Sequence, residues 1–566
     1  MNPLLTPGRI GSVEIRNRIV MPPMTTRLSD PEGNVTDDTI AYYMARVRGG
    51  VGMITVEMAS PTRAGRHRKR ELGIYDDRFL PGLKRLTDTI HAGGAKCSIQ
   101  LGHGGGHTRI DICGETPLAP SAIPHPVFEV TNETIIPKEM TAADIRATIA
   151  GYAAAGARAE KAGFDCVEIH AAHGYLISQF LTPFENRRTD EYGGALENRA
   201  RFGLEVLRAV KAAVTIPVIF RISVDDYFPE GMPEHEGIQV AVWAAQAGAD
   251  ALHVAAGHYR SLPSAARMIP PMEYPDATFL AYAAEVKRQV GVPVIAVGRL
   301  GDPTAATDAV ASGKADFVSL GRTLIADPEW VAKLERGEPI RRCLACNTCV
   351  NEMRGGTQLR CVVNGAAGRE SLFAKARPPK GERIAVIGAG PAGLTYASLV
   401  AAGNTVTVFE RADRAGGAFR YAGKAPLFQE VRANPASFER YIRDMVALCE
   451  TRGVTFRYGV DVARTPDALA PFDRIVIASG ARYRFGLGGL VTALLDSGAA
   501  HWRGLRAAMT NDMVREWFYH DARRATGAAL RKLARPEQKV VVIGDALQAG
   551  KSRPAIASAF QAALLS

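Results

Sequence analysis

The sequence predicts an α/β protein with an N-terminal (β/α)8 TIM barrel, a short cysteine-rich segment and a C-terminal Rossmann-like domain. Three observations predict this order: apolar runs alternate with helical stretches, four cysteines follow at close spacing, and a glycine-rich turn then joins two apolar runs. A chain of 566 residues is too long for one ordinary core. We expect domains at 1–335, 336–380, and 381–481 with 538–566, interrupted by a helical insert at 482–537.

Composition narrows the class of protein. Hydrophobic residues make up 47% and charged residues 22%, as in an ordinary globular protein. No apolar run is long enough to predict a transmembrane segment, and no secretory signal is recognisable, so we expect a cytoplasmic protein. The net charge of +11 is modest for this length, and no basic block with interleaved aromatic residues indicates nucleic-acid binding.

Eight apolar runs have the length of buried strands, and helical stretches such as 197–214 lie between them. Near-continuous apolar strands separated by helices indicate a buried parallel sheet, and eight such units fit a (β/α)8 barrel. The predicted strands span residues 17–25, 51–59, 95–103, 164–173, 217–225, 251–258, 292–299 and 315–322.

Polar residues stand at the C-terminal ends of these strands, where TIM barrels carry their chemistry. Closing a strand explains one or two polar residues, but it does not explain eight that converge on one face. The predicted site comprises Thr25, Gln100, His170, His173, Arg221, His258, Arg299 and Arg322.

The stretch HAAHGYLISQFLTPFENRRTDEYGGALENRARF, residues 170–202, resembles the signature of old yellow enzyme flavoproteins. The chain is similar to the branch that contains 2,4-dienoyl-CoA reductase, enoate reductases and trimethylamine dehydrogenase. That branch joins an FMN barrel, an iron–sulfur cluster and a nucleotide-binding module. The resemblance therefore implies an FMN- and iron–sulfur-dependent oxidoreductase with an electron-transfer chain.

The resemblance also implies an FMN site at the strand ends. Gln100 matches the residue that bonds the pyrimidine end of the flavin, and Arg221 matches the cation that stabilises the anionic reduced flavin. Alone, Gln100 could be a strand-end cap and Arg221 a structural ion pair. The last two strands end where such barrels bind phosphate. The implied FMN neighbours are Pro23, Met24, Thr25, Gln100, Arg221, Gly298, Arg299, Gly321 and Arg322.

His170, His173 and Tyr175 share the end of the fourth predicted strand. In ene-reducing members of the family, the paired imidazoles hydrogen-bond a substrate carbonyl and the tyrosine delivers a proton. Hydride addition to the β-carbon of an activated alkene requires such donors at the carbonyl oxygen and an acid at the α-carbon. Histidines are more often structural than catalytic, but the H-x-x-H-x-Y spacing favours catalysis.

At two positions the sequence differs from the amine dehydrogenases of this branch, which favours alkene reduction over amine oxidation. In the amine dehydrogenases a tyrosine matches His170, and a cysteine that attaches FMN lies near the position of Met24; this chain has neither. His258 and Tyr259, at the sixth strand end, are candidate substrate contacts. We favour an ene-reductase of an α,β-unsaturated carbonyl or enoyl/dienoyl-CoA-type substrate. The alternatives are an amine dehydrogenase or N-demethylase that passes electrons outward to a carrier protein, and an electron-transfer subunit without barrel chemistry.

The loop at 61–72 follows the second predicted strand on the catalytic side. Its basic residues could attract a substrate carboxylate or the phosphates of CoA, and a solvated loop is the competing interpretation. These residues are Arg63, Arg66, Arg68, Lys69 and Arg70.

Four cysteines are spaced C-x2-C-x2-C-x11-C, a density that suits zinc or a 4Fe-4S cluster. Zinc usually takes two paired knuckles, and a disulfide is not expected in the cytoplasm. The segment resembles the iron–sulfur segment of the flavoprotein branch, so zinc is the alternative and a one-electron relay is the favoured interpretation. The predicted ligands are Cys343, Cys346, Cys349 and Cys361.

A strand, a G-x-G-x-x-G turn, a helix and a second strand that ends in an acid follow the cysteines. This order predicts a site for a dinucleotide or an ADP moiety. The region resembles the FAD-binding half of dienoyl-CoA reductase, which implies FAD, or ADP in its place, with Asp545 on a ribityl hydroxyl. The predicted residues are Gly388, Gly390, Ala392, Gly393, Glu410, Gly417 and Asp545.

The insert at 482–537 stands where NADPH-using relatives carry a second Rossmann unit. It is too short for one and lacks its glycine pattern. Direct NAD(P)H oxidation at an FAD is therefore doubtful, and a ferredoxin or an electron-transferring flavoprotein is the expected partner besides a small-molecule substrate; a homo-oligomer is also allowed. The basic, amphipathic stretch 514–535 could dock that partner, lie on a membrane surface or pack on its own domain.

Overall fold

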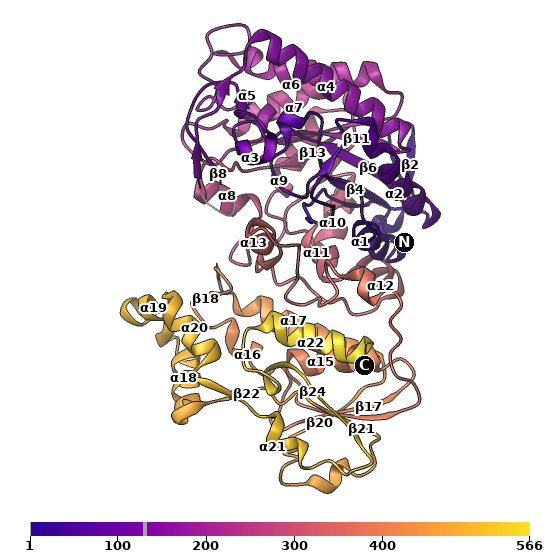
Figure 1. Ribbon diagram of the computed structural model, residues 1–566, viewed down its shortest axis with the longest axis vertical. Helices are drawn as coiled ribbons and strands as arrows, with labels where there is room; N and C mark the ends of the chain where they lie inside the picture. The colour runs from indigo at the N-terminus through magenta and orange to yellow at the C-terminus, as the bar shows by residue number, and fades with distance from the viewer. Residues whose placement is uncertain (1, 128–132, 566) are drawn as a thin grey trace. The chain divides into compact units, whose positions relative to one another are not determined.

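The computed structural model describes residues 2–127 and 133–565 (Figure 1) and divides into two compact units. The barrel unit comprises Met1–Pro270, Tyr274–Leu324 and Val350–Leu359. The C-terminal unit comprises Pro271–Glu273, Ile325–Cys349 and Arg360–Ser566. Among the residues described, none of the helices combines the length and the apolar character that crossing a bilayer requires.

Eight parallel strands form a closed barrel in the first unit, because β3 pairs with both β15 and β4. All eight predicted strands are confirmed, and a two-residue strand, β5 (Leu72–Gly73), pairs alongside β4. The barrel strands are β3 (Ile19–Met21), β4 (Met53–Ser60), β6 (Lys96–Leu101), β11 (Cys166–Ala171), β12 (Val218–Ser223), β13 (Ala251–Ala255), β14 (Val294–Ala296) and β15 (Phe317–Ser319).

Helices follow the strands and surround the barrel (Figure 1), as a (β/α)8 fold requires. The stretch predicted at 197–214 is α6 (Leu196–Ala213), whose buried face carries Phe202, Val206 and Val210. The other long helices are α1 (Asp37–Arg48), α2 (Leu80–Ala92), α4 (Ala142–Lys161), α7 (Glu234–Gln246), α9 (Leu280–Gln289) and α10 (Pro303–Ala311).

A hairpin closes the N-terminal end of the barrel. Its strands, β1 (Gly8–Ile10) and β2 (Val13–Ile15), contribute Ile10 and Ile15 to a buried cluster with residues from the first halves of the barrel strands, including Val20 and Ile219. Because this end is filled by apolar side chains, polar groups of the barrel can gather only at the C-terminal ends of the strands.

The C-terminal unit contains a five-stranded parallel sheet in the order β20-β17-β16-β21-β24, the order of one Rossmann half with two further strands. Helix α15 (Pro391–Val400) follows the glycine turn, and α17 (Pro435–Thr451) and α22 (Ser552–Leu564) pack against it. The strands are β16 (Arg383–Ile387), β17 (Thr405–Glu410), β20 (Thr455–Tyr458), β21 (Arg474–Ile477) and β24 (Lys539–Val542).

Residues 482–537 hold no parallel strand pair; they form four short helices and an antiparallel pair of strands, β22 (Ala481–Tyr483) with β23 (Arg523–Ala525). The amphipathic stretch 514–535 is not one continuous helix. The pairing of β23 with β22, and a bond from the Thr526 hydroxyl to the Gly480 carbonyl at 2.6 Å, break the helix after residue 520. The helices are α18 (Leu487–Asp496), α19 (Arg503–Thr510), α20 (Asp512–His520) and α21 (Gly527–Arg531).

Candidate functional site

A buried polar network crosses four neighbouring barrel strands. Strand register sets Gln100 beside Glu168, and it aligns His170, Arg221 and His253. Gln100 Nε2 donates to Glu168 Oε1 at 2.8 Å, and His253 Nδ1 lies 2.8 Å from Glu168 Oε2. Burial raises the pKa of Glu168, but His253, Arg221 and Gln100 outweigh burial and hold this pKa below its usual value. The Glu168 carboxylate is therefore ionised, and it holds the side chains of Gln100 and His253 in place.

Arg221 completes this network. Its Nη1 lies 3.8 Å from Glu168 Oε1, while its Nε is buried without a hydrogen-bond partner in the described part of the chain. A buried N–H donor without an acceptor costs free energy, so this atom fits a ligand acceptor at the strand end.

The loop after β3 presents Pro23, Met24 and Thr25 as half-exposed residues between buried neighbours. Strand β4 holds this loop in place, because Thr26 donates its backbone N–H and its hydroxyl to Glu57 of that strand, at 2.8 and 2.6 Å. Gly321 lies against it: a Cβ on Gly321 would come within 2.9 Å of Met24 Sδ. The residues that follow the first and the last barrel strands are thus partly exposed and lie against each other.

The two arginines predicted at the phosphate end have protein partners. Arg299 Nη2 lies 2.7 Å from Asp276 Oδ1, and its Nε donates to the Pro275 carbonyl at 3.1 Å. Arg322 Nη2 donates to the Pro270 carbonyl at 2.8 Å. Both guanidiniums are therefore held in place by the protein; Gly298, which precedes Arg299, is buried, and Gly321, which precedes Arg322, is partly exposed.

His170, His173 and Tyr175 come together after β11. The ring centroids of His170 and His173 lie 5.2 Å apart, and those of His170 and Tyr175 lie 4.9 Å apart. Burial lowers the pKa of both imidazoles well below the usual value, and Arg221 lowers it further. Neutral imidazoles each carry one N–H donor, so the pair can hydrogen-bond an oxygen on which negative charge develops.

The Tyr175 hydroxyl has a partner that sequence reasoning missed. It lies 3.2 Å from His67 Nε2, and His67 Nδ1 lies 2.8 Å from Glu71 Oε2. Both His67 and Glu71 are about 1% exposed. Because Nδ1 faces the carboxylate, Nε2 is the acceptor and Tyr175 donates to it. The H-x-x-x-E spacing within the basic loop was the available signal.

Tyr259 lies beside Tyr175, with ring centroids 5.6 Å apart, and His107 stacks on it at 4.5 Å. Two guanidiniums reach its hydroxyl: Arg68 from the loop at 61–72 and Arg354 from α13 (Thr348–Arg354). Burial raises the pKa of Tyr259, but Arg354 and Arg68 outweigh burial and lower it to about 8. Arg354 was not predicted, because it lies between Cys349 and Cys361, far from the barrel strands in the sequence.

His258, the other candidate substrate contact, is fully buried. Its Nδ1 accepts from the Arg260 backbone N–H at 3.0 Å, and its Nε2 lies 3.2 Å from Glu185 Oε2. Glu185 also faces His125 Nε2 at 2.9 Å. Both ring nitrogens of His258 are therefore engaged, which gives this residue a supporting position behind the strand end.

The four clustered cysteines all lie in the C-terminal unit. Ala345 and Asn347 have φ of 53° and 55°, so the backbone turns sharply between the first three cysteines. The Ala345 N–H donates to Cys343 Sγ at 3.3 Å. Burial, followed by the neighbouring Cys343 and Cys346, raises the pKa of Cys361 to about 12. Cys361 therefore joins the group despite its distance in sequence.

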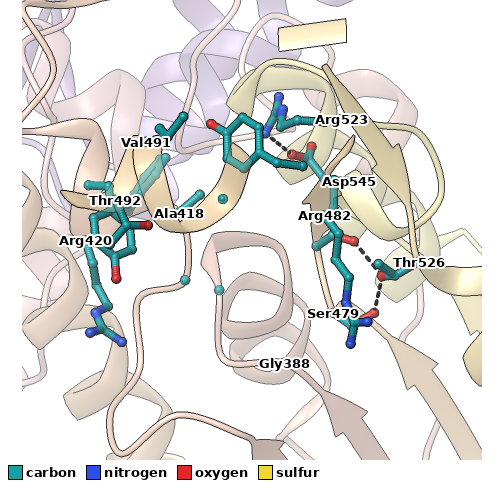
Figure 2. Close-up of a pocket in the computed structure, with 18 of the residues that line it drawn as sticks. Gly388, Ala418, Arg420, Ser479, Arg482, Val491, Thr492, Arg523, Thr526 and Asp545 are labelled. Atoms are coloured by element: carbon teal, nitrogen blue, oxygen red, sulfur yellow. Dashed lines mark hydrogen bonds and ion pairs between the residues drawn. The ribbon is translucent and has the colours of Figure 1, made fainter. Parts of the chain in front are cut away.

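A cavity of about 1470 Å³ opens at the glycine turn of the C-terminal unit (Figure 2). The predicted nucleotide residues lie on its wall, apart from Gly393, which packs beneath the turn: a Cβ there would come 2.0 Å from the Gly388 carbonyl oxygen. Glu410 accepts from the Ala389 and Ala412 N–H groups at 2.8 and 2.9 Å. The predicted residues on the wall are Gly388, Gly390, Ala392, Glu410, Gly417 and Asp545.

The insert forms another part of this wall. Val491, Thr492 and Arg523 line the cavity, and Arg523 Nη1 pairs with Asp545 Oδ2 at 3.0 Å, as Figure 2 shows. Ser479 and Thr526 are linked at 2.8 Å beside them. The insert thus packs on its own unit, as one of the alternatives predicted. Its Arg523 forms an ion pair with Asp545, the residue that was predicted to bind a ribityl hydroxyl.

Residues 3–340 match the family model described as NADH:flavin oxidoreductase / NADH oxidase family. Residues 386–429 match a model of an NAD(P)-binding Rossmann-like domain.

Three similar proteins span both units. NADH oxidase of Thermoanaerobacter brockii is 38% identical, over 84% of this chain and 72% of that protein. Cinnamate reductase of Clostridium sporogenes is 32% identical, over 85% of this chain and 74% of that protein. The solved structure of histamine dehydrogenase from Rhizobium sp. 4-9 is 28% identical, with a TM-score of 0.74 over 85% of this chain and 69% of that one.

Proposed function

This chain belongs to the NADH:flavin oxidoreductase / NADH oxidase family and is an FMN-dependent oxidoreductase, and we propose that its barrel reduces the carbon–carbon double bond of an α,β-unsaturated carbonyl compound. The observation that carries the proposal is the group of His170, His173 and Tyr175 at the end of β11, beside Arg221. The similarity to cinnamate reductase supports it.

The strand ends fit FMN. The unpartnered Arg221 Nε supplies a donor for the flavin ring, Gln100 stands two strands away, and the accessible surface of Pro23, Met24 and Thr25 suits a planar ring system. The phosphate is expected at the ends of the last two strands, at Gly298, Arg299, Gly321 and Arg322, where protein partners hold the two arginines in place. When bound, FMN supplies a hydride from its reduced form.

The chain's own residues supply the rest of the reaction. The alkene takes up one hydride at the β-carbon and one proton at the α-carbon. The neutral imidazoles of His170 and His173 donate to the carbonyl oxygen, where negative charge develops. Tyr175 provides the proton. His67, held by Glu71, keeps the Tyr175 oxygen in place through their hydrogen bond.

Cys343, Cys346, Cys349 and Cys361 would hold a 4Fe-4S cluster, which transfers single electrons. The sharp turns at residues 345 and 347 and the gathering of Cys361 with Cys343 and Cys346 support this set of ligands. We expect Cys346→Ser to lose iron and acid-labile sulfide, whereas Cys449→Ser, in the apolar core of the same unit, keeps both. Zinc in place of iron in the purified wild-type protein would overturn the cluster.

The cavity of the C-terminal unit would hold FAD, or ADP in its place. Its glycine turn, its volume and Glu410 support a bound dinucleotide. Because the insert builds one wall of this cavity and contains no second Rossmann unit, we expect an external electron carrier, such as a ferredoxin or an electron-transferring flavoprotein, to exchange electrons with the protein. Rapid anaerobic bleaching of the flavins by NADH or NADPH would contradict this expectation.

One anaerobic experiment tests the reaction. The reduced protein is mixed with a panel of α,β-unsaturated carbonyl compounds, and the oxidised protein with methylated amines and histamine. Reoxidation of the flavin by the unsaturated compounds is the expected result. Bleaching by the amines would instead favour amine oxidation, which the similarity to histamine dehydrogenase supports. No response in either arm would favour an electron-transfer subunit.

A further inference from the structure

Two arginines of the barrel unit lie at Tyr259, whose ring neighbours that of Tyr175, and they have no part in the reaction described above. Arg68 is 1% exposed, although it belongs to a loop of basic residues, and its Nη1 donates to the Thr25 hydroxyl at 3.2 Å. Arg354 lies over the Tyr259 ring, with its Cζ 5.1 Å from the ring centroid. The two guanidiniums converge on the Tyr259 hydroxyl.

The other basic residues of the loop at 61–72 bind other groups or are exposed. Lys69 pairs with Asp111 at 3.2 Å on the surface. Arg66 Nη2 donates to the Pro31 carbonyl at 3.2 Å, and Arg70 Nη1 donates to the Ser29 carbonyl at 3.0 Å. Arg63 is exposed. Of the five basic residues of the loop, Arg68 is the one whose side chain is buried at the site.

Arg354 has unsatisfied donors. Its Nε and Nη2 are buried and have no hydrogen-bond partner in the described part of the chain. Three oxygens of two buried carboxylates are engaged elsewhere: Glu71 Oε2 accepts the backbone N–H groups of His67 and Arg68, and both oxygens of Glu57 bind Thr26. A planar fork of free N–H donors matches a carboxylate, which can accept two of them at once.

We propose that Arg68 and Arg354 form a carboxylate-binding subsite next to Tyr175 and Tyr259, so that the preferred substrate is an unsaturated carbonyl compound that bears a carboxylate. The proposal rests on the proposed function and names its substrate class. It separates two kinds of substrate found among the similar proteins, since cinnamate is an anion and histamine is a cation that two guanidiniums repel.

A carboxylate at this place also suits its neighbours. His107 stacks on Tyr259, and burial lowers the pKa of His107 well below its usual value, so this imidazole is neutral and adds no charge. Tyr259 offers an aromatic face and a hydroxyl beside the two cations. The subsite therefore combines positive charge with an aromatic wall, as an arylated or otherwise apolar carboxylate requires.

Binding to the oxidised holoenzyme tests the subsite without catalysis. Three unreactive ligands of equal shape are titrated against the flavin absorption spectrum: 3-phenylpropanoate, its neutral amide and the corresponding ammonium compound. We expect the carboxylate to bind about tenfold to a hundredfold more tightly than the amide, and the ammonium compound to bind most weakly.

Substitutions show which residue causes the preference for the carboxylate over the amide. Arg354→Gln is expected to remove the difference between carboxylate and amide, and Arg354→Lys to restore part of it. Lys69→Gln, a neighbouring cation on the surface, should leave both affinities unchanged. Arg68→Lys gives a second, smaller reduction that does not empty a buried position.

Equal affinity of carboxylate and amide in the wild-type protein would overturn the subsite, as would an equal loss of both in Arg354→Gln. These outcomes differ from a failure of the proposed function. If Arg354 governs carboxylate binding but no unsaturated compound reoxidises the reduced flavin, the subsite stands and the reaction is wrong. If neutral and anionic enones are reduced equally well, the reaction stands and the subsite is wrong.

Discussion

The barrel site is built mainly from side chains, whereas the C-terminal cavity is built around the backbone of a glycine turn. At the barrel strand ends the functional groups are side chains from separate strands, and most of them are buried and paired, as Glu168 is with His253 and Gln100. In the C-terminal cavity the wall is backbone at the glycine turn, closed by an insert whose Arg523 pairs with Asp545. The first site therefore depends on the identity of single side chains, and the second depends on the shape of the backbone.

This difference predicts how each region fails. A substitution at the barrel site should change the chemistry while the cofactor stays bound. A substitution at the glycine turn should exclude the nucleotide while the barrel keeps its chemistry. The following experiments examine this contrast in order of expected effect.

The largest effect is expected at Gly393. Its substitution by alanine places a Cβ 2.0 Å from the Gly388 carbonyl oxygen, so the turn must move and the dinucleotide site is lost. Flavin released by denaturation should contain FMN without FAD. Gly504→Ala, in α19 with nothing within 4 Å of the added atom, should keep both flavins. Retention of FAD in Gly393→Ala would contradict a nucleotide site built on this turn.

Tyr175→Phe should lower the rate of flavin reoxidation by an unsaturated substrate by a factor of about 100 or more, the usual contribution of a general acid. FMN content should not change, because the hydroxyl faces His67. Tyr192→Phe, which removes a hydroxyl bound to Glu205, is the matched control. A Tyr175→Phe protein with the wild-type rate would remove this residue from the mechanism.

His67 should act through Tyr175. His67→Phe removes the acceptor of the Tyr175 hydroxyl. We expect roughly a tenfold lower kcat with little change in KM, since this hydrogen bond keeps the Tyr175 oxygen in place. His67→Gln, whose side-chain oxygen can still accept, should recover most of the rate. Equal losses in the two variants would indicate that His67 only supports the local packing.

The smallest effect concerns pH. Arg68 and Arg354 lower the pKa of Tyr259 to about 8, and the groups that face it besides these are the neutral His107 and Tyr175. Below this pH the hydroxyl is protonated and the guanidiniums are available to a ligand; above it the phenolate competes for them. Carboxylate affinity should therefore fall up to tenfold per pH unit above about 8.

Tyr259→Phe checks that assignment, because it removes the competing phenolate. Its affinity for 3-phenylpropanoate, measured by flavin titration, should stay constant between pH 6 and 9. The same decline in wild type and variant would place the titrating group elsewhere.

Much of the barrel could be predicted because periodic apolar runs determine the strands, and parallel strands end on one face. That reasoning places Gln100, His170 and Arg221 on neighbouring strands, as their register confirms. Glu168 and His253 were detectable as charged or polar residues inside apolar runs. The roles of the predicted residues in binding and catalysis remain predictions.

Residues outside the barrel strands could not be predicted in the same way. Arg68 was one of five basic loop residues with no pattern to single it out, His67 had only the H-x-x-x-E spacing as a signal, and no local pattern places Arg354 beside Tyr259. Arg523 meets Asp545 because β23 pairs with β22, and the amphipathic pattern of 514–535 conceals that short strand. Tertiary pairing prevailed over local helical propensity here.

The most direct test of the central claim is a single turnover of the reduced protein with an α,β-unsaturated carboxylate under anaerobic conditions, with product analysis. We predict that flavin reoxidation yields an equivalent amount of the saturated carboxylate, and that Tyr175→Phe slows both by the same factor. Reduced flavin that persists with the unsaturated carboxylate, together with oxidised flavin that an amine bleaches, would contradict the account.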